Sequence, residues 1–196
     1  MRQIDGTTEC RVHNALETSA APVAVRSPRL LVLGIGNALL SDDGAGLHLL
    51  ARLMQCAPAL PAEVRYVDGG TVGLALTPYL EDCDACLVLD AMRLGAAPGT
   101  VHVYAGAGMD EAIARPCGTP HEVSLGDLFT ALRLQGRVPE RRALIGIEPG
   151  SIGWGTDPTP AVAASLAAAA DTANQLLRDW AGAWCTGRDA LMEVLP

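Results

Sequence analysis

The sequence predicts an α/β fold: a single-domain, three-layer α/β/α sandwich with a mostly parallel five-stranded sheet. Short, continuously apolar runs, such as residues 30–35 and 85–90, are typical of strands that are buried on both faces. These runs alternate with segments whose apolar residues have helical spacing, as in βαβ units. A chain of 196 residues, 49% of them hydrophobic, can supply one core of that size.

The five expected strands are bounded by turn signals. Asp68-Gly69-Gly70-Thr71 follows the second strand, Pro98-Gly99 precedes the fourth, and Pro149-Gly150 ends the fifth. The sequence therefore predicts strands over residues 30–35, 64–67, 85–90, 100–104 and 143–147.

Four segments are expected to be helical. Pro78 shortens the second of them, and Ser124-x-x-Asp127 has the form of a capping box at the start of the third. Residues 105–122, rich in Gly, Pro and Cys, are expected to be irregular. The helical segments are residues 43–55, 72–80, about 124–132 and about 160–181.

The chain is expected to have three regions, and its composition argues against several classes of partner. Residues 1–28 are expected to form a disordered N-terminal arm, 29–183 the folded domain and 184–196 a C-terminal tail. The net charge of -8 and the lack of a basic stripe argue against nucleic acid. No apolar run reaches the roughly 18 residues of a membrane span, and no secretory signal is visible, so we expect a cytoplasmic protein without membrane insertion.

The first candidate site segment is residues 34–44, GIGNALLSDDG, which follows the first strand. It resembles a dinucleotide-binding loop, but Leu39 stands where G-x-G-x-x-G requires its third glycine. Asp42 and Asp43 make the start of the following helix anionic, which favours a cation over a phosphate. The alternative is that one of these acids caps the helix.

Two further residues complete a set of possible metal ligands. Asp90 ends the third strand, and His121 precedes a helix N-terminus, where the helix dipole favours the neutral imidazole that ligates metals. Each alone has a simpler interpretation, as a solvated strand end and a solvated loop histidine. Together with Asp43, they offer two carboxylates and one imidazole and leave coordination positions open, as catalytic sites for Ni, Zn or Mn require.

Other polar residues have structural interpretations. Cys83 and Cys86 match C-x-x-C, but there is no second pair and the motif runs into a strand, so we expect buried structural thiols. Asp68 and Glu148 end strands and could support the site from behind, or, for Asp68, hold the Gly69-Gly70 turn.

Five segments between about residues 30 and 180 carry a family resemblance. They are GIGNALLSDDGAG (34–46), DGGTVGLALTPYLEDCDACLVLDAM (68–92), APGTV (97–101), HEVSLGDLFTALRLQG (121–136) and IGIEPGSIGWG (145–155). In this order they resemble the maturation endopeptidases of nickel-iron hydrogenases. The resemblance implies a twisted, mostly parallel sheet in a hydrogenase maturation peptidase domain over residues 29–183. It also implies removal of a C-terminal extension from the hydrogenase large-subunit precursor after nickel insertion.

The resemblance places the catalytic and metal-contacting residues on Asp43, Asp90 and His121. It implies a metal-recognising endopeptidase of aspartic or metallo type, which contacts nickel carried by its substrate, with other divalent ions able to replace it. Either the metal or a carboxylate would activate the water. Two alternatives stay open: a non-catalytic chaperone that checks nickel insertion, and a flavodoxin-like small-ligand binding module.

Overall fold

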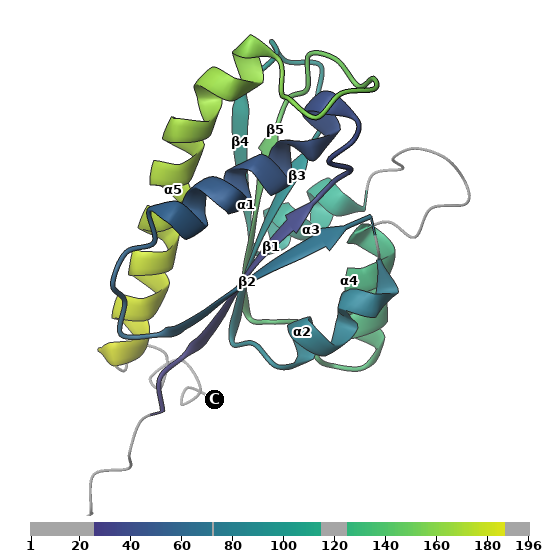
Figure 1. Ribbon diagram of the computed structural model, residues 1–196. Helices are drawn as coiled ribbons and strands as arrows, with labels where there is room; N and C mark the ends of the chain where they lie inside the picture. Colours follow the sequence, from purple (N-terminus) through teal and green to yellow (C-terminus); the bar gives the residue numbers. More distant parts are fainter. Residues whose placement is uncertain (1–25, 72, 115–124, 187–196) are drawn as a thin grey trace, which may run out of the picture.

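The computed structural model describes residues 26–71, 73–114 and 125–186, which form an α/β domain (Figure 1). Within these residues, five strands make one sheet in the order β2-β1-β3-β5-β4. Strands β1, β2, β3 and β5 run parallel, and β4 pairs antiparallel with β5 at the edge. The strands are β1 (Arg29–Ile35), β2 (Glu63–Gly70), β3 (Ala85–Ala91), β4 (Val101–Ala105) and β5 (Arg141–Ile147).

Helices cover both faces of the sheet. Helices α1 (Ala45–Gln55) and α5 (Pro160–Cys185) lie on one face (Figure 1). The other face carries α2 (Thr77–Glu81), α3 (Ala107–Ile113) and α4 (Leu125–Leu134). The predicted three-layer sandwich with its mostly parallel sheet is therefore confirmed.

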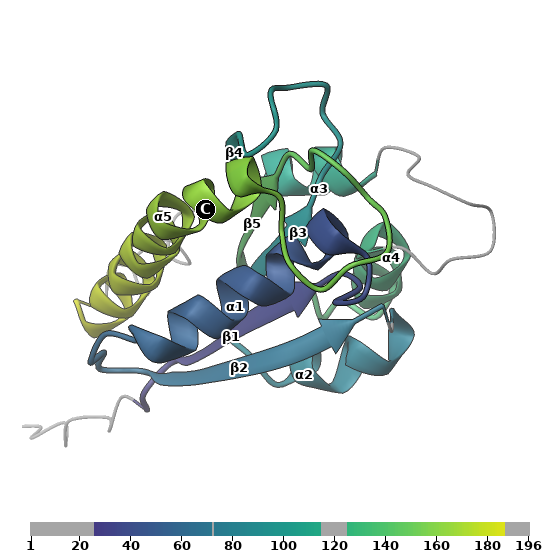
Figure 2. The same ribbon diagram turned by 45° about the horizontal axis from the view of Figure 1, so that its top comes forward.

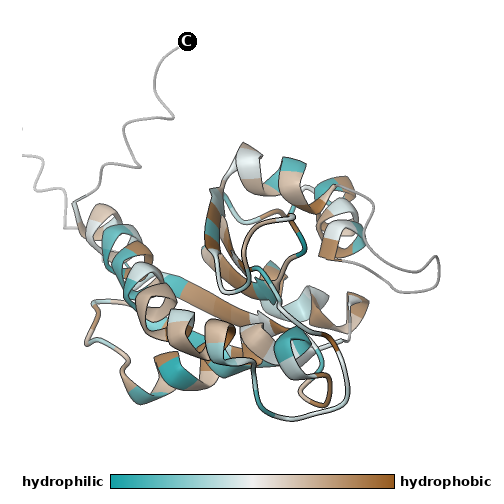
Figure 3. Ribbon diagram, turned by 90° about the horizontal axis from the view of Figure 1, so that it is seen from above, coloured by the Kyte–Doolittle hydropathy of each residue, from teal (hydrophilic) through white to brown (hydrophobic). Residues whose placement is uncertain are grey.

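The alternation of side chains along the strands divides the core between the two faces. In β1, Leu30 and Val32 pack with α1 and α5, whereas Leu31 and Leu33 pack with the helices of the other face. Both sets are apolar, because β1 is a central strand covered on each side. Figure 3 shows this arrangement from above, with hydrophobic stretches in brown on the sheet and a mixture of hydrophobic and hydrophilic residues on the helices that flank it.

The expectation of irregular structure over residues 105–122 is wrong in its first part. Helix α3 occupies Ala107–Ile113, and it buries Met109 and Ala112 against the sheet. Gly106 and Gly108 suggested a loop, but the helix is held by tertiary contacts: Asp110 accepts hydrogen bonds from Arg142 on β5 at 2.9 and 2.5 Å. The predicted cap Ser124 and the rest of that segment lie outside the described residues.

Three other helices differ from prediction at their ends. The first begins with a 3-10 turn, η1 (Ser41–Gly44), before α1 proper. A short 3-10 turn, η2 (Leu74–Leu76), also precedes α2. Helix α5 continues to Cys185 rather than ending near residue 181, and the Trp184 side chain donates a hydrogen bond to the Arg26 carbonyl at 3.2 Å.

The strand order places a topological switch point between β1 and β3. After β1 the chain crosses to β2 on one side, and after β2 it crosses back to β3 on the other. The loops that leave β1 and β3 therefore diverge, and parallel sheets form their binding crevices at the carboxyl ends of such strands.

Helix α1 lies directly on these two strand ends. A Cβ atom on Gly46 would overlap the carbonyl oxygens of Ile35 and Leu89, the residues near the ends of β1 and β3. The glycine thus permits an approach that no larger residue would allow. In the described ranges, no helix is both long enough and apolar enough to span a membrane.

Candidate active site

The loop after β1 brings Asp43 to the carboxyl end of the sheet. Gly36 has a φ of 129°, and a Cβ atom there would overlap the carbonyl oxygen of Asp43. The tight loop that glycine permits places the Asn37 amide 3.0 Å from Oδ2 of Asp43, to which it donates a hydrogen bond. Among the described residues, the second carboxylate oxygen of Asp43 accepts no hydrogen bond, so this half-buried side chain keeps acceptor capacity.

Asp90 lies at the end of β3, on the other side of the switch point. Burial, together with the nearby charge of Asp43, raises the pKa of Asp90 to about 7, against a hydrogen bond from the Ala91 amide that lowers it. That hydrogen bond, 2.8 Å long, fixes Oδ1 of the carboxyl group. The structure thus brings two of the predicted acids close enough for the charge of one to influence the protonation of the other.

The third predicted residue, His121, lies outside the described residues. In the ranges that the structure describes, no three His, Cys, Asp or Glu side chains are grouped so that they could hold a metal ion. The metal-ligand roles of Asp43, Asp90 and His121 therefore stay predictions, two of them with a defined position at the switch point.

Asp42 has a different role from its neighbour. Its side chain is fully buried and makes no cap hydrogen bond to η1 or α1, so the capping alternative is wrong. Its carboxylate instead accepts hydrogen bonds from the amides of Gly150, Ser151 and Thr159 at 2.8, 3.0 and 2.6 Å, and from the Thr159 hydroxyl at 2.8 Å. This Asp42 hydrogen-bond cluster fastens the loop after β5 to the loop that carries Asp43.

The protonation of Asp42 follows from these contacts. Burial alone would raise its pKa, but the hydrogen bonds from Thr159, Ser151 and Gly150 outweigh burial and lower the pKa below its ordinary value. Asp42 is therefore a structural anchor that is charged at neutral pH. The loop that it holds, residues 148–159, passes over the start of α1 (Figure 2).

Glu148 anchors the third loop of this edge. The side chain is buried, and its Oε2 accepts hydrogen bonds from the amides of Leu94 and Ala96 at 2.7 and 3.2 Å. Burial opposes ionisation, yet these hydrogen bonds lower the pKa of Glu148. The supporting role considered for Glu148 thus takes a specific form: it holds the loop that begins directly after Asp90.

Two of the structural interpretations are confirmed. Asp68 Oδ1 accepts a hydrogen bond from the Gly70 amide at 2.9 Å, so Asp68 holds the glycine turn. Cys83 and Cys86 are free thiols, and burial raises the pKa of Cys83 to about 12. A thiol that stays protonated is a poor nucleophile and a poor metal ligand, so the C-x-x-C pair is structural.

The model of a family described as hydrogenase maturation proteases matches residues 48–176, a stretch that contains Asp90 and begins shortly after Asp43. The hydrogenase expression/formation protein HupD of Rhodobacter capsulatus is 37% identical over 158 residues, which cover 80% of this chain and 75% of that protein. The hydrogenase 2 maturation protease of Escherichia coli is 32% identical over 152 residues, with 77% and 92% covered.

The fold is shared with a solved structure from the same family. The hydrogenase maturating endopeptidase HybD of Escherichia coli superposes with a TM-score of 0.71 at 32% identity, over 77% of this chain and 93% of that one. The family model, the relatives and this structure agree with each other. The chain therefore belongs to the hydrogenase maturation protease family.

Proposed function

We propose that this protein is a cytoplasmic endopeptidase that removes the C-terminal extension of a hydrogenase large-subunit precursor and recognises the nickel already bound there. Membership of a family of hydrolases that mature hydrogenases supports the reaction class. The observation that carries the site is the pair of carboxylates, Asp43 and Asp90, at the switch point of the sheet. Such a pair is a suitable receptor for a divalent ion held by another protein.

The pair has a protonation state that suits conditional binding. With a pKa of about 7, Asp90 is partly protonated at neutral pH, because it has lost much of its hydration at the strand end and lies near Asp43. A divalent ion on the precursor would favour its ionised form and so release a proton on binding. A precursor without nickel offers no such gain, so differential binding would couple cleavage to nickel insertion.

The same acids could also serve the hydrolysis step. Once ionised, one of the two carboxylates can accept a proton from an attacking water. His121 would complete the contacts to the metal, and the nickel, which belongs to the substrate, would polarise the scissile carbonyl group. In this proposal the chain itself supplies the residues that contact the metal and the carboxylate that accepts the proton.

A processing assay tests the proposal. Purified nickel-loaded precursor is incubated with the protein, and mass spectrometry follows loss of the C-terminal peptide. We expect Asp43→Asn, Asp90→Asn and His121→Ala each to lower the cleavage rate by about 100-fold or more. The exposed Asp171 on α5 provides the control, since Asp171→Asn should cleave at the wild-type rate.

The outcomes separate the alternatives. Cleavage of the nickel-loaded precursor, with sparing of the nickel-free form, supports the endopeptidase. Binding to the loaded form with an unchanged mass would support the non-catalytic chaperone instead. Full activity in any one of the three site variants would remove that residue from the mechanism.

A further inference from the structure

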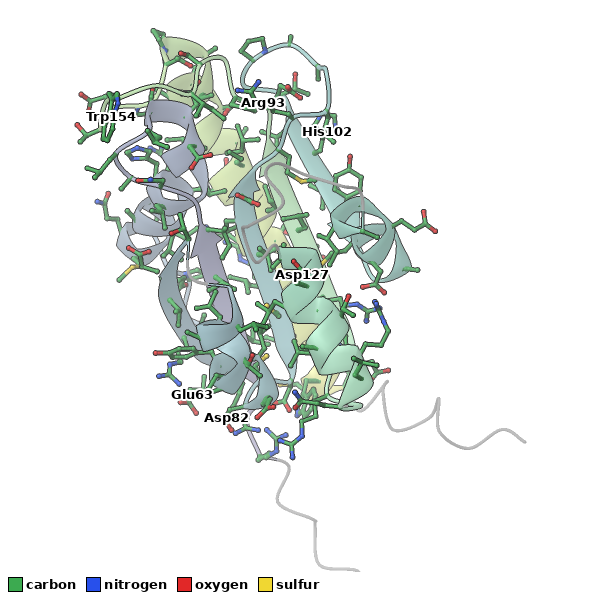
Figure 4. The ribbon with its side chains drawn as sticks, turned by 90° about the vertical axis from the view of Figure 1, so that its right-hand side faces the viewer. Glu63, Asp82, Arg93, His102, Asp127 and Trp154 are labelled. Atoms are coloured by element: carbon green, nitrogen blue, oxygen red, sulfur yellow. The ribbon has the colours of Figure 1, made fainter. Side chains whose placement is uncertain are left out.

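An exposed apolar surface borders the candidate site. Leu39, Ile152 and Trp154 are 55%, 37% and 88% exposed, and we call these three residues the apolar rim. Single exposed apolar residues are common on proteins, but a group of them beside a candidate site is informative. Figure 4 shows Trp154 at the same end of the molecule as Arg93, a residue in the loop after the strand that carries Asp90. Glu63 and Asp82 lie at the opposite end.

Backbone hydrogen bonds join the two parts of the rim. The Gly155 amide donates to the Leu39 carbonyl at 3.0 Å, and the Ser41 amide donates to the Gly155 carbonyl at 2.7 Å. Leu40 and Gly155 form a parallel bridge, so Trp154 and Leu39 lie on adjoining backbone segments. A Cβ atom added at Gly153 would meet nothing within 4 Å, so the turn between Ile152 and Trp154 is open.

The rim is held in place from below by the Asp42 hydrogen-bond cluster. The cluster binds Gly150, Ser151 and Thr159, on either side of the rim loop. The Ser41 hydroxyl adds a hydrogen bond to the Asp157 carbonyl at 3.0 Å. Trp154 is therefore exposed on a backbone that hydrogen bonds hold in place, so the loop itself loses little entropy when a partner covers it.

We propose that the apolar rim is the docking surface for the polypeptide substrate, where it binds an apolar segment of the precursor next to the scissile bond. This inference rests on the proposed function. The occupant follows from continuity: the rim residue Leu39 and the site residue Asp43 belong to one loop, whose Leu40 carbonyl accepts a hydrogen bond from the Asp43 amide at 3.1 Å. A polypeptide whose scissile bond lies at Asp43 and Asp90 must also cover the surface beside them.

The test compares steady-state cleavage of nickel-loaded precursor by the full-length wild type and by Trp154→Ala. We expect KM to rise about tenfold or more, with kcat nearly unchanged, because a buried tryptophan is a typical hot-spot residue that binds without taking part in the chemistry. Trp154→Phe should recover most of the affinity. The matched control is Leu134→Ala, since Leu134 is 86% exposed at the end of α4 and should have a wild-type KM.

A fluorescence measurement reports the docking itself. The difference between the emission of wild type and Trp154→Phe isolates Trp154, and we expect it to shift to shorter wavelength when precursor is added. An unchanged KM in Trp154→Ala would overturn the inference. A dimer of the isolated protein that depends on Trp154, detected by sedimentation, would also overturn it, because the rim would then bind a second copy of the chain. Emission showing that Trp154 is already shielded from water in the isolated chain would overturn it as well.

The two proposals fail in different ways. If the wild type does not cleave the precursor, the endopeptidase proposal fails, and the titration still measures docking on its own. A Trp154-dependent dissociation constant for the precursor then supports the rim as a docking surface, and identical binding by Trp154→Ala overturns it.

Discussion

Asp90 ends a buried strand, and its carboxyl group loses much of its hydration when the protein folds. A rise of its pKa from 3.8 to about 7, at 1.36 kcal/mol for each pKa unit, corresponds to an unfavourable contribution on the order of 4 kcal/mol once the group is ionised. A neutral residue would suit this position better for folding alone. The presence of an acid there is consistent with a role in recognition or catalysis.

Replacement of this acid should therefore stabilise the isolated protein. We expect Asp90→Asn to raise the free energy of unfolding at pH 8 by up to about 4 kcal/mol, less whatever the buried amide loses in hydrogen bonding. At pH 4 the gain should nearly vanish, because the folded wild type is then protonated at Asp90. Urea unfolding at both pH values measures this, with Asp171→Asn, at an exposed position, as the neutral control. Equal stability of the two proteins at pH 8 would contradict a raised pKa.

Sequence reasoning could locate the candidate acids near the strand ends, but not the anchoring role of Asp42. Asp43 and Asp90 follow buried parallel strands, and that position alone predicts that they lie at one edge of the sheet. Asp42 differs, because its hydrogen-bond partners Gly150 and Thr159 are 108 and 117 residues away. The resemblance to the family assigns the site role to Asp43, but the anchoring role of Asp42 follows only from the three-dimensional path of the loop after β5.

Among the elements, α1 controls the geometry of the site, because its first residues follow directly from Asp43. The helix rests on the ends of β1 and β3 through Gly46, whose missing side chain leaves room for the carbonyl oxygens of Ile35 and Leu89. A displacement of α1 would therefore move Asp43 relative to Asp90. The contact connects a packing requirement of the fold to the spacing of the candidate acids.

A pair of glycine substitutions tests this connection. Gly46→Ala should destabilise the protein by about 1–3 kcal/mol and slow precursor cleavage, because the new methyl group overlaps backbone that cannot move freely. Gly182→Ala, in α5, has open space around its Cβ atom and should stabilise by up to about 1 kcal/mol with no change in cleavage. Thermal unfolding and the processing assay give both readouts. If Gly46→Ala is destabilised but cleaves the precursor at the wild-type rate, the packing of α1 does not determine the geometry of the site.

The elements themselves were predictable to different degrees. Continuous apolar runs located β1, β3 and β5, because strands buried on both faces leave no polar positions. Helix α3 escaped prediction, because its glycines indicate a loop while its stability comes from Met109 in the core and from the ion pair between Asp110 and Arg142. Local propensity is a weak guide where tertiary contacts decide.

For the described part of the molecule as a whole, the acids with shifted pKa values fall into two groups with opposite effects on stability. The hydrogen bonds of Asp42 and Glu148, and the arginine partners of Asp84 and Asp110, lower the pKa values of these four carboxyl groups in the folded protein. Their stabilising contribution is complete above the ordinary pKa values of 3.8 and 4.5 and is lost as the pH falls through the lower, folded values. Asp90 acts in the other direction, because its raised pKa means that stability declines as the pH rises from about 4 to 7.

The sum of these effects predicts a free energy of unfolding that is highest between about pH 4 and 5, where the gain from the four acids with lowered pKa values levels off and the decline caused by Asp90 begins. Asp90→Asn should remove much of the decline towards pH 7, and Asp42→Asn should lower the maximum and weaken the decline below about pH 4. Urea unfolding of the full chain at intervals from pH 3 to 8, for wild type and both variants, measures all three profiles. A wild-type profile that keeps rising up to pH 8 would show that Asp90 is ionised in the folded protein throughout. The candidate site would then have to acquire its selectivity for a metal-loaded precursor without any proton release from Asp90.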